Sequence, residues 1–100
     1  MSSTRQLAAI MFTDIVGYTD MMQTDEQKAL TVIKHYNATL EKWVTQHGGR
    51  VANYYGDGSL CIFNSATAAV QCSVDIQREL RQEPVVPLRI GLHIGEVIFE

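Results

Sequence analysis

Four apolar blocks along this chain have the length and residue types of β-strands. Residues 7–13, LAAIMFT, form a continuous apolar run, which is typical of a strand covered on both faces. Residues 50–55 and 59–63 are predicted to form two strands joined by Gly-Asp-Gly, a strong hairpin signal. Residues 88–97 alternate between apolar and polar positions, so that one face of a fourth strand carries Leu88, Ile90, Leu92 and Ile94.

Two longer segments carry apolar residues at the spacing of an amphipathic helix. The sequence TDEQ predicts the start of the first helix, with Thr24 as the N-cap and Gln27 in the reciprocal position of a capping box. That helix is expected to end at the glycines of residues 47–49, and the second helix is expected to begin after Asn64 or Ser65. The predicted buried stripes are Ala29, Ile33, Tyr36, Leu40, Trp43 and Val44 on the first helix, and Ala69, Val70, Ser73, Ile76 and Leu80 on the second.

The order of these elements, β-α-β-β-α-β, predicts a ferredoxin-like α+β fold in which an antiparallel sheet carries two helices on one face. Right-handed crossovers make the first and second strands parallel, with the third strand between them. Residues 1–100 are expected to form a single domain with its core over residues 7–98. Because the last strand reaches the end of the chain without a stop signal, we expect this domain to be incomplete at its C-terminus.

This topology brings two acidic residues together. Asp14 follows the first strand, Asp57 lies in the turn between the second and third strands, and both positions fall at the same edge of the sheet. Two carboxylates about 5 Å apart repel each other by roughly 3 kcal/mol at an effective dielectric constant of about 20. Either one of them takes up a proton or a cation lies between them.

The ligands expected at this edge are oxygen atoms, with no His or Cys nearby, which predicts two Mg²⁺ or Mn²⁺ ions rather than Zn²⁺. A carboxylate pair that holds two divalent ions is used for phosphoryl and nucleotidyl transfer. Taken alone, Asp14 is explained as the N-cap of the turn that follows it, and Asp57 as an ordinary hairpin residue. Their predicted adjacency favours the metal site.

The segment after Asp14 fits the same chemistry. The sequence IVGYT leaves the strand and enters a short helical turn over residues 16–22. The backbone N–H groups of Val16 to Thr19 are therefore placed to bind phosphate oxygens at a helix N-terminus. Gly17 allows a ligand to approach the backbone closely.

Composition and charge narrow the class of protein. The chain is 46% hydrophobic and 19% charged, with a formal net charge of −3 and no clustered basic run, which argues against nucleic-acid binding. The N-terminus lacks an apolar leader, and no apolar run approaches the length of a membrane span, so a cytoplasmic segment without direct membrane contact is expected. Cys61 and Cys72 have no metal-binding spacing and are predicted to be buried, reduced thiols.

Three segments, FTDIVGYT, YYGDGSLCIF and LRIGLHIGEV, together resemble the class III nucleotide cyclases, the adenylate and guanylate cyclase catalytic domains, over residues 7–98. The resemblance implies a head-to-tail homodimer with active sites at its interface. It also implies conversion of a nucleoside triphosphate to a 3′,5′-cyclic monophosphate and pyrophosphate, in intracellular signalling.

The resemblance also implies roles for individual residues. Asp14 and Asp57 would hold both ions, with the backbone carbonyl of Ile15 as a further ligand. One ion would activate the ribose 3′-hydroxyl and the other would bind the triphosphate. The positions that match the family's phosphate-binding segment are Phe12, Gly17, Tyr18 and Thr19.

This sequence departs from the family pattern at Asn53. The resemblance implies that this position reads the purine base from across the dimer. ATP-using members usually carry a lysine there and guanylate cyclases tend to carry a glutamate, so the purine preference stays open, with ATP favoured by analogy with bacterial-type sequences. The residues that stabilise the transition state in this family lie downstream of residue 98. We therefore expect the 100-residue segment alone to be inactive.

Two other functions are compatible with the pattern. A polymerase-palm or diguanylate-cyclase-like nucleotidyl transferase also places two carboxylates at this edge, although its hairpin would carry a Gly-Gly-acidic sequence. The second alternative is a degenerate, non-enzymatic cyclase-like domain that binds nucleotide or dimerises to regulate a partner. Asn53 is the only residue that supports it. Two polar residues of the last strand are also assigned roles. His93 is assigned a structural role rather than that of a general base, and Arg89 is assigned to a surface ion pair, with a phosphate contact as the alternative.

Overall fold

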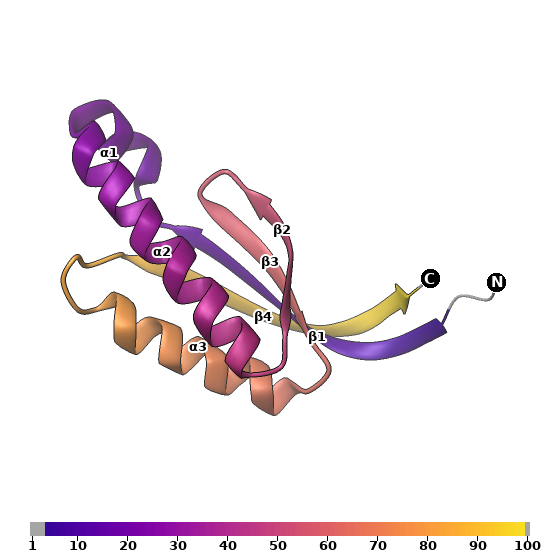
Figure 1. Ribbon diagram of the computed structural model, residues 1–100. Coiled ribbons are helices and arrows are strands. Elements are labelled where there is room, and N and C mark those ends of the chain that lie inside the picture. The colour runs from indigo at the N-terminus through magenta and orange to yellow at the C-terminus, as the bar shows by residue number, and fades with distance from the viewer. Residues whose placement is uncertain (1–3, 100) are drawn as a thin grey trace.

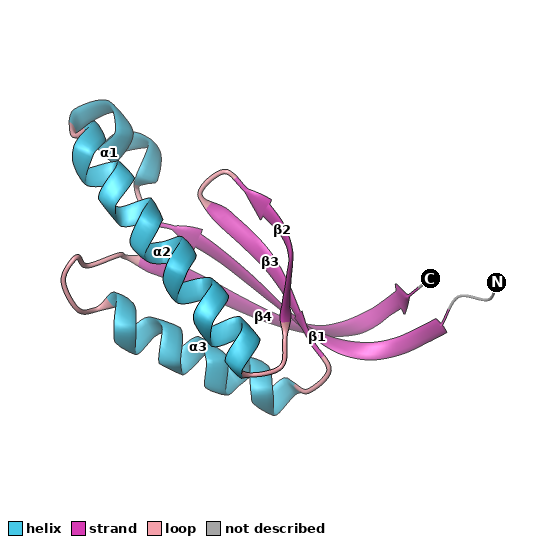
Figure 2. Cartoon of the chain, in the orientation of Figure 1, coloured by secondary structure: helices cyan, strands magenta, loops and turns pink. Residues whose placement is uncertain are grey.

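The computed structural model describes residues 4–99, which form one four-stranded antiparallel sheet with helices against one face (Figures 1 and 2). The strands lie in the order β2-β3-β1-β4, so that β3 separates the parallel strands β1 and β2, and the predicted ferredoxin-like topology is confirmed. Along the chain the elements are β1 (Thr4–Ile15), α1 (Tyr18–Thr24), α2 (Glu26–Gln46), β2 (Arg50–Tyr55), β3 (Gly58–Phe63), α3 (Ala66–Leu80) and β4 (Leu88–Phe99).

Strands β1 and β4 are longer than predicted. They pair along their whole length, and beyond the helices they continue as a two-stranded ribbon (Figure 1). Leu92 and Ile94 share the face of Leu88, as predicted, but they are 43% and 52% exposed, whereas Leu88 is buried. The alternation along β4 therefore predicted which face of the strand is apolar, but not how much of that face is buried.

The outer face of β1, opposite the helices, is uncovered at Phe12, although Ala8 on the same face is buried. Phe12 is 46% exposed there, whereas its neighbours Met11 and Thr13 are buried under the helices. The prediction of a strand covered on both faces is therefore wrong within the described residues. An apolar run of this kind shows that both faces avoid water, but it does not identify what covers the second one.

The helix α2 begins one residue later than predicted. Its N-cap is Asp25, whose carboxylate accepts a hydrogen bond from the Lys28 N–H at 3.1 Å, so the assignment of Thr24 as N-cap, and the capping box with it, is wrong. Thr24 is the last residue of α1, and its hydroxyl donates to the Asp20 carbonyl at 2.9 Å. An aspartate caps a helix as well as a threonine does, and here the preceding short helix already uses the threonine.

The predicted end of α2 and start of α3 are confirmed, whereas α1 begins and ends two residues later than the helical turn predicted over residues 16–22. Ser65 caps α3 by accepting a hydrogen bond from the Ala68 N–H at 3.2 Å. The chain leaves α2 through Gly48, which has a φ of 75° that favours glycine.

The core lies between the sheet and the helices α2 and α3. The predicted buried stripes of the two helices are correct at most positions. On α2, however, Val32 and Thr39 are fully buried, whereas the predicted Ile33 and Trp43 are only half-buried. On α3, the predicted Val70 is 49% exposed. Both cysteines are buried free thiols, as predicted. The largest fully buried side chains include Met11, Tyr36, Leu40, Phe63, Ile76 and Leu80.

A polar contact joins the two long helices. The Glu79 carboxylate on α3 accepts hydrogen bonds from three residues of α2: the Thr39 hydroxyl at 2.7 Å, the Trp43 indole at 3.2 Å, and Lys42. The Lys42 ammonium and then the Thr39 hydroxyl lower the pKa of Glu79 below its usual value.

Glu79→Gln should therefore destabilise the fold in a pH-dependent way. Because the folded protein lowers the pKa of Glu79, the ionised carboxylate stabilises the fold above the unfolded pKa of about 4.3, and this contribution is lost as the pH falls through the folded value. Urea unfolding at pH 7 should show a clear stability difference between wild type and Glu79→Gln, and that difference should shrink toward pH 3. The exposed Glu83→Gln serves as the control, and a pH-independent difference for Glu79→Gln would contradict the assignment.

Candidate functional site

The pairing of β1 with β3 brings Asp14 and Asp57 to one edge of the sheet, as the topology predicts. Asp14 lies opposite Gly58, and the Ile15 N–H donates to the backbone carbonyl of Asp57 at 3.0 Å. Both aspartates line one cavity of about 270 Å³. Two carboxylates from separate segments of the chain thus share one solvent-accessible space.

The turn between β1 and α1 forms another wall of this cavity. Its lining includes Gly17, Tyr18, Thr19 and Asp20, and also Ile15. Gly17 has a φ of 71°, and a Cβ atom added there would meet nothing within 4 Å. The backbone conformation, rather than a lack of space, therefore requires glycine at this turn.

Two residues of the predicted phosphate-binding segment do not line the cavity. The Val16 N–H already donates to the Pro87 carbonyl at 2.8 Å, so it is not free to bind a phosphate in this structure. Phe12 lies outside the cavity on the uncovered sheet face.

Arg89 lines the cavity, although the sequence favoured a surface ion pair over a phosphate contact for it. The ion pair is confirmed, but its partner is Asp14: the Arg89 Nε donates to Asp14 Oδ1 at 2.9 Å, and the two residues lie opposite each other on β4 and β1. Their side chains are 72% and 46% exposed. An ion pair this exposed is worth less than about 1 kcal/mol, so a stronger ligand can displace the guanidinium from the carboxylate.

The donor atoms at this edge fit a hard divalent cation. The two predicted ligands, Asp14 and Asp57, line the cavity together with Ile15, whose carbonyl is the predicted third ligand, and with a third carboxylate, that of Asp20. Within residues 4–99 no group of three or more His, Cys, Asp or Glu side chains is placed to hold a metal ion. Mg²⁺ fits such a partial set, because it is usually bound by one or two carboxylates and completed by water and substrate phosphates.

The candidate base-reading residue, Asn53, lies on the same face of the sheet as Asp14. It is exposed and does not line the cavity, but it pairs with Leu60, which in turn pairs with Phe12. Two residues further along each strand, the next row on the same face carries Tyr55, Gly58 and Asp14. Asn53 therefore lies one row from the cavity, across the uncovered face.

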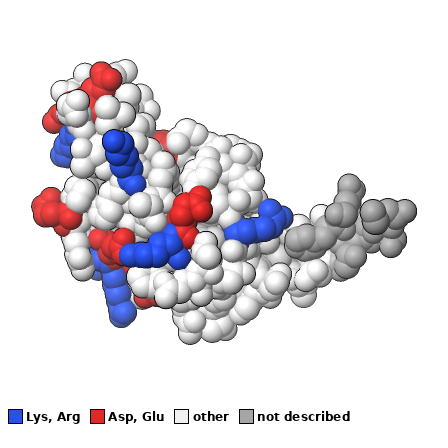
Figure 3. All heavy atoms as spheres, in the orientation of Figure 1, with Lys and Arg blue, Asp and Glu red and all other residues white. Residues whose placement is uncertain are grey.

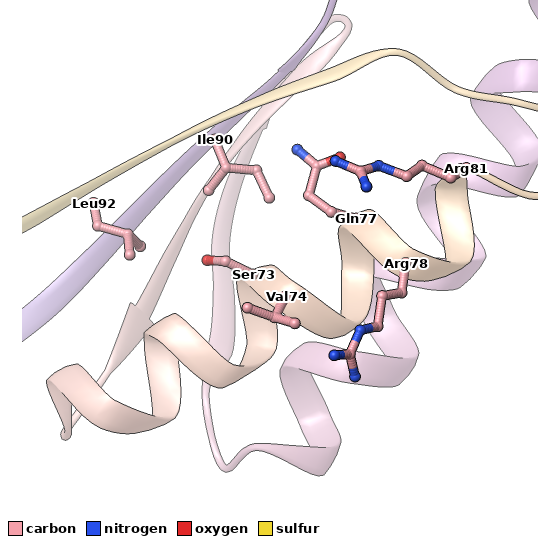
Figure 4. A pocket seen from close by; sticks show the side chains of 7 residues that line it. All are labelled: Ser73, Val74, Gln77, Arg78, Arg81, Ile90 and Leu92. Atoms are coloured by element: carbon pink, nitrogen blue, oxygen red, sulfur yellow. The ribbon is translucent and has the colours of Figure 1, made fainter.

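A larger groove, of about 430 Å³, lies between α3 and β4 (Figure 4). Figure 4 shows Ile90 and Leu92 pointing from β4 toward α3, with Arg81 reaching over Gln77 at one end. The residues that line this groove include no carboxylate, so it offers no acidic ligand for a divalent cation.

On the face shown in Figure 3, basic and acidic side chains are interspersed.

Close packing beside Asp14 depends on Gly58, which the sequence indicated only as a turn glycine. A Cβ atom added to Gly58 would lie 2.5 Å from the Thr13 carbonyl oxygen and 3.3 Å from the Asp14 Cβ. The backbones of β1 and β3 therefore approach too closely at this point for any other residue.

Gly58→Ala should therefore force the two strands apart and destabilise the protein by about 1–3 kcal/mol, the usual cost of overpacking. Gly91→Ala is the matched control, because a Cβ atom there meets nothing within 4 Å and Gly91 lies opposite Phe12 on the same sheet. The measurement is the urea unfolding midpoint. Equal midpoints for the two variants would show that the strands tolerate a side chain beside Asp14.

Comparison with known proteins gives consistent matches. A family model described as "Adenylate and Guanylate cyclase catalytic domain" matches residues 1–100. A protein of Rhizobium meliloti (strain 1021) named "Putative adenylate cyclase 3" is 36% identical over 104 residues, which cover 96% of this chain and 18% of that protein.

Solved structures show the same relationship. The adenylate/guanylate cyclase/hydrolase from Silicibacter pomeroyi is 32% identical with a TM-score of 0.84, covering 99% of this chain and 62% of that chain. The guanylyl cyclase Cya2 is 26% identical with a TM-score of 0.81, covering 98% of this chain and 58% of that chain. This chain thus spans less than two thirds of the length of each of these relatives. Among the described residues, no helix has the length and apolar character needed to cross a membrane.

Proposed function

We propose that this chain, which belongs to the family of adenylate and guanylate cyclase catalytic domains, supplies the metal-binding half of a site that converts ATP to 3′,5′-cyclic AMP and pyrophosphate. The observation that carries this proposal is the convergence of Asp14 and Asp57, from different strands, on one cavity. GTP is the alternative substrate, since the solved relatives include a guanylyl cyclase.

Charge explains why this site would need cations. The cavity is lined by three carboxylates, those of Asp14, Asp20 and Asp57, and by one cationic side chain, Arg89. A nucleoside triphosphate would be repelled by this excess of negative charge. Asp14 and Asp57, with the Ile15 carbonyl, would hold two Mg²⁺ or Mn²⁺ ions. When bound, these ions would promote ionisation of the ribose 3′-hydroxyl and neutralise the triphosphate.

The remaining cavity residues would then bind and orient the substrate. A divalent ion on Asp14 would displace Arg89, whose guanidinium lines the same cavity and can form paired hydrogen bonds with phosphate oxygens. The N–H groups of Tyr18 and Thr19, in the first turn of α1, would bind the same phosphate oxygens, because the first N–H groups of a helix have no partner within it. Arg89 would thus exchange one anion, a carboxylate, for another, a phosphate.

The uncovered sheet face is proposed to pack against a second copy of the chain in a head-to-tail homodimer. Phe12 is 46% and Tyr55 is 57% exposed, and the partly exposed Ile10, Leu60 and Ile62 lie on the same face. A contiguous apolar patch beside a polar site is typical of a protein interface. In such a dimer Asn53 would contact the purine of the nucleotide bound across the interface. We also propose that the domain acts in the cytoplasm, where its two free thiols stay reduced.

Asp14→Asn and Asp57→Asn should each reduce cyclic nucleotide formation by the full-length protein at least about a hundredfold, because each removes a metal-binding charge while keeping the shape of the side chain. Asp20→Asn is the matched control, since Asp20 lines the same cavity but is not a proposed ligand. Each protein is incubated with Mn²⁺ and ATP or GTP, and the product is identified by mass spectrometry. Wild-type turnover in either of the first two variants would refute the metal assignment.

Asn53→Lys should raise the ratio of activity with ATP to activity with GTP, because it restores the residue that ATP-using members usually carry at this position. The ratio of kcat/KM values for the two nucleotides, measured under identical Mn²⁺ concentrations, checks this. If the ratio does not change, Asn53 does not contact the base.

A further inference from the structure

Three buried hydroxyl groups lie directly beneath the two aspartates. The Thr13 Oγ1 is 2.6 Å from the Tyr36 hydroxyl and 2.6 Å from the Ser59 Oγ. The three residues come from β1, α2 and β3 and are 5%, 0% and 2% exposed, respectively. They occupy the helix-facing side of the sheet, where the adjacent residues Met11 and Cys61 are fully buried.

The register of the sheet links these hydroxyls to the carboxylates. Thr13 pairs with Ser59, and the next pair along the same two strands is Asp14 with Gly58. Because consecutive side chains of a strand point to opposite faces, the hydroxyl pair lies behind the sheet at the point where Asp14 projects in front of it. Ser59 also follows Asp57 by two residues, at the start of β3.

Each hydroxyl of this cluster has at least one hydrogen-bond partner, and Ser59 also lies 3.7 Å from the Cys61 Sγ. A hydroxyl carries one proton and two lone pairs, so Thr13 can donate to one neighbour and accept from the other. Burial raises the pKa of Tyr36, although its hydrogen bonds to Ser59 and Thr13 partly offset this, so the phenol stays protonated at neutral pH. Among the described residues, no buried side-chain nitrogen or oxygen lacks a partner.

Stability alone does not explain three hydroxyls in this position. Replacing a buried hydrogen-bonded pair with apolar groups of the same shape is often nearly neutral for stability. A satisfied polar network differs from apolar packing in that it fixes the positions of its members. Here the fixed members are Thr13, which precedes Asp14, Ser59, which follows Asp57 by two residues, and Tyr36 of helix α2.

We propose that Tyr36 is a positioning residue for the metal site: through Thr13 and Ser59 it holds β1, β3 and α2 in the arrangement that lets Asp14 and Asp57 bind common divalent ions. This inference rests on the proposed function and extends it inward from the cavity. Tyr36 touches neither substrate nor metal. Its effect is on the affinity for the ions and on the rate that depends on them.

A second tyrosine that links helix α2 to the sheet provides a matched control. Tyr54 on β2 also donates its hydroxyl to helix α2, to the Glu41 carboxylate. It does not line the aspartate cavity. Tyr54→Phe and Tyr36→Phe therefore each remove one hydroxyl that joins α2 to the sheet, but only the second lies beneath the aspartates.

The test compares Mn²⁺ binding in the full-length wild type, Tyr36→Phe and Tyr54→Phe. Free Mn²⁺ is titrated by electron paramagnetic resonance in the presence of 3′-deoxy-ATP, which lacks the attacking hydroxyl. Tyr36→Phe should raise the Mn²⁺ dissociation constant by about tenfold, the usual scale for residues that orient metal ligands, whereas Tyr54→Phe should stay within about twofold of wild type. The Mn²⁺ concentration at half-maximal cyclisation of ATP should shift in parallel, with a smaller change in the KM for the nucleotide.

Variants at Thr13 keep the question decidable if Tyr36→Phe does not fold. Thr13→Ser keeps the hydroxyl and should bind Mn²⁺ like wild type, whereas Thr13→Val removes it and should show the weakened binding. Equal Mn²⁺ dissociation constants for Tyr36→Phe and Tyr54→Phe, or for Thr13→Ser and Thr13→Val, would overturn the positioning role while leaving the proposed function intact. A wild-type protein that binds no Mn²⁺ and forms no cyclic nucleotide would overturn both.

Discussion

The antiparallel pairing of β1 with β3 is the interaction on which the site depends. It places Asp14 opposite Gly58 on the open face and Thr13 opposite Ser59 on the helix face. A shift of one residue in this register would exchange the two faces. The Asp14 carboxylate would then be buried beneath Tyr36 without a cation, which is strongly unfavourable. Burial of the helix face therefore also fixes which residues reach the cavity.

The charge distribution around the cavity follows from this pairing. β4 continues the sheet on the other side of β1, so Arg89 lies beside Asp14 and partly neutralises it. Because this ion pair is exposed, it is weak enough to open when a divalent ion arrives. Two contacts therefore act on Asp14. The buried hydroxyl network behind the sheet fixes its backbone, and the exchangeable ion pair with Arg89 in front of the sheet occupies its side chain.

Local patterns in the sequence were sufficient to predict the element order, the start of α3 after Asn64 or Ser65, and the adjacency of the two aspartates, because each follows from spacing or from a general rule of topology. The Thr24 cap failed because Asp25, the next residue, caps equally well. Val70 was assigned to the core although its neighbours leave it exposed, since the width of a buried stripe is set by tertiary packing. Arg89 and the buried hydroxyls could not be placed without the register, which joins residues as far apart as Asp14 and Arg89.

A crystal structure of the full-length protein with Mn²⁺ and 3′-deoxy-ATP, with anomalous diffraction recorded at the manganese absorption edge, tests the central claim most directly. We expect anomalous peaks bonded to the carboxylates of both Asp14 and Asp57, with Arg89 released from Asp14 and turned toward the phosphates. Manganese bound elsewhere, or two aspartates that share no ion while the Arg89–Asp14 pair stays closed, would contradict the metal site and the cyclase mechanism built on it.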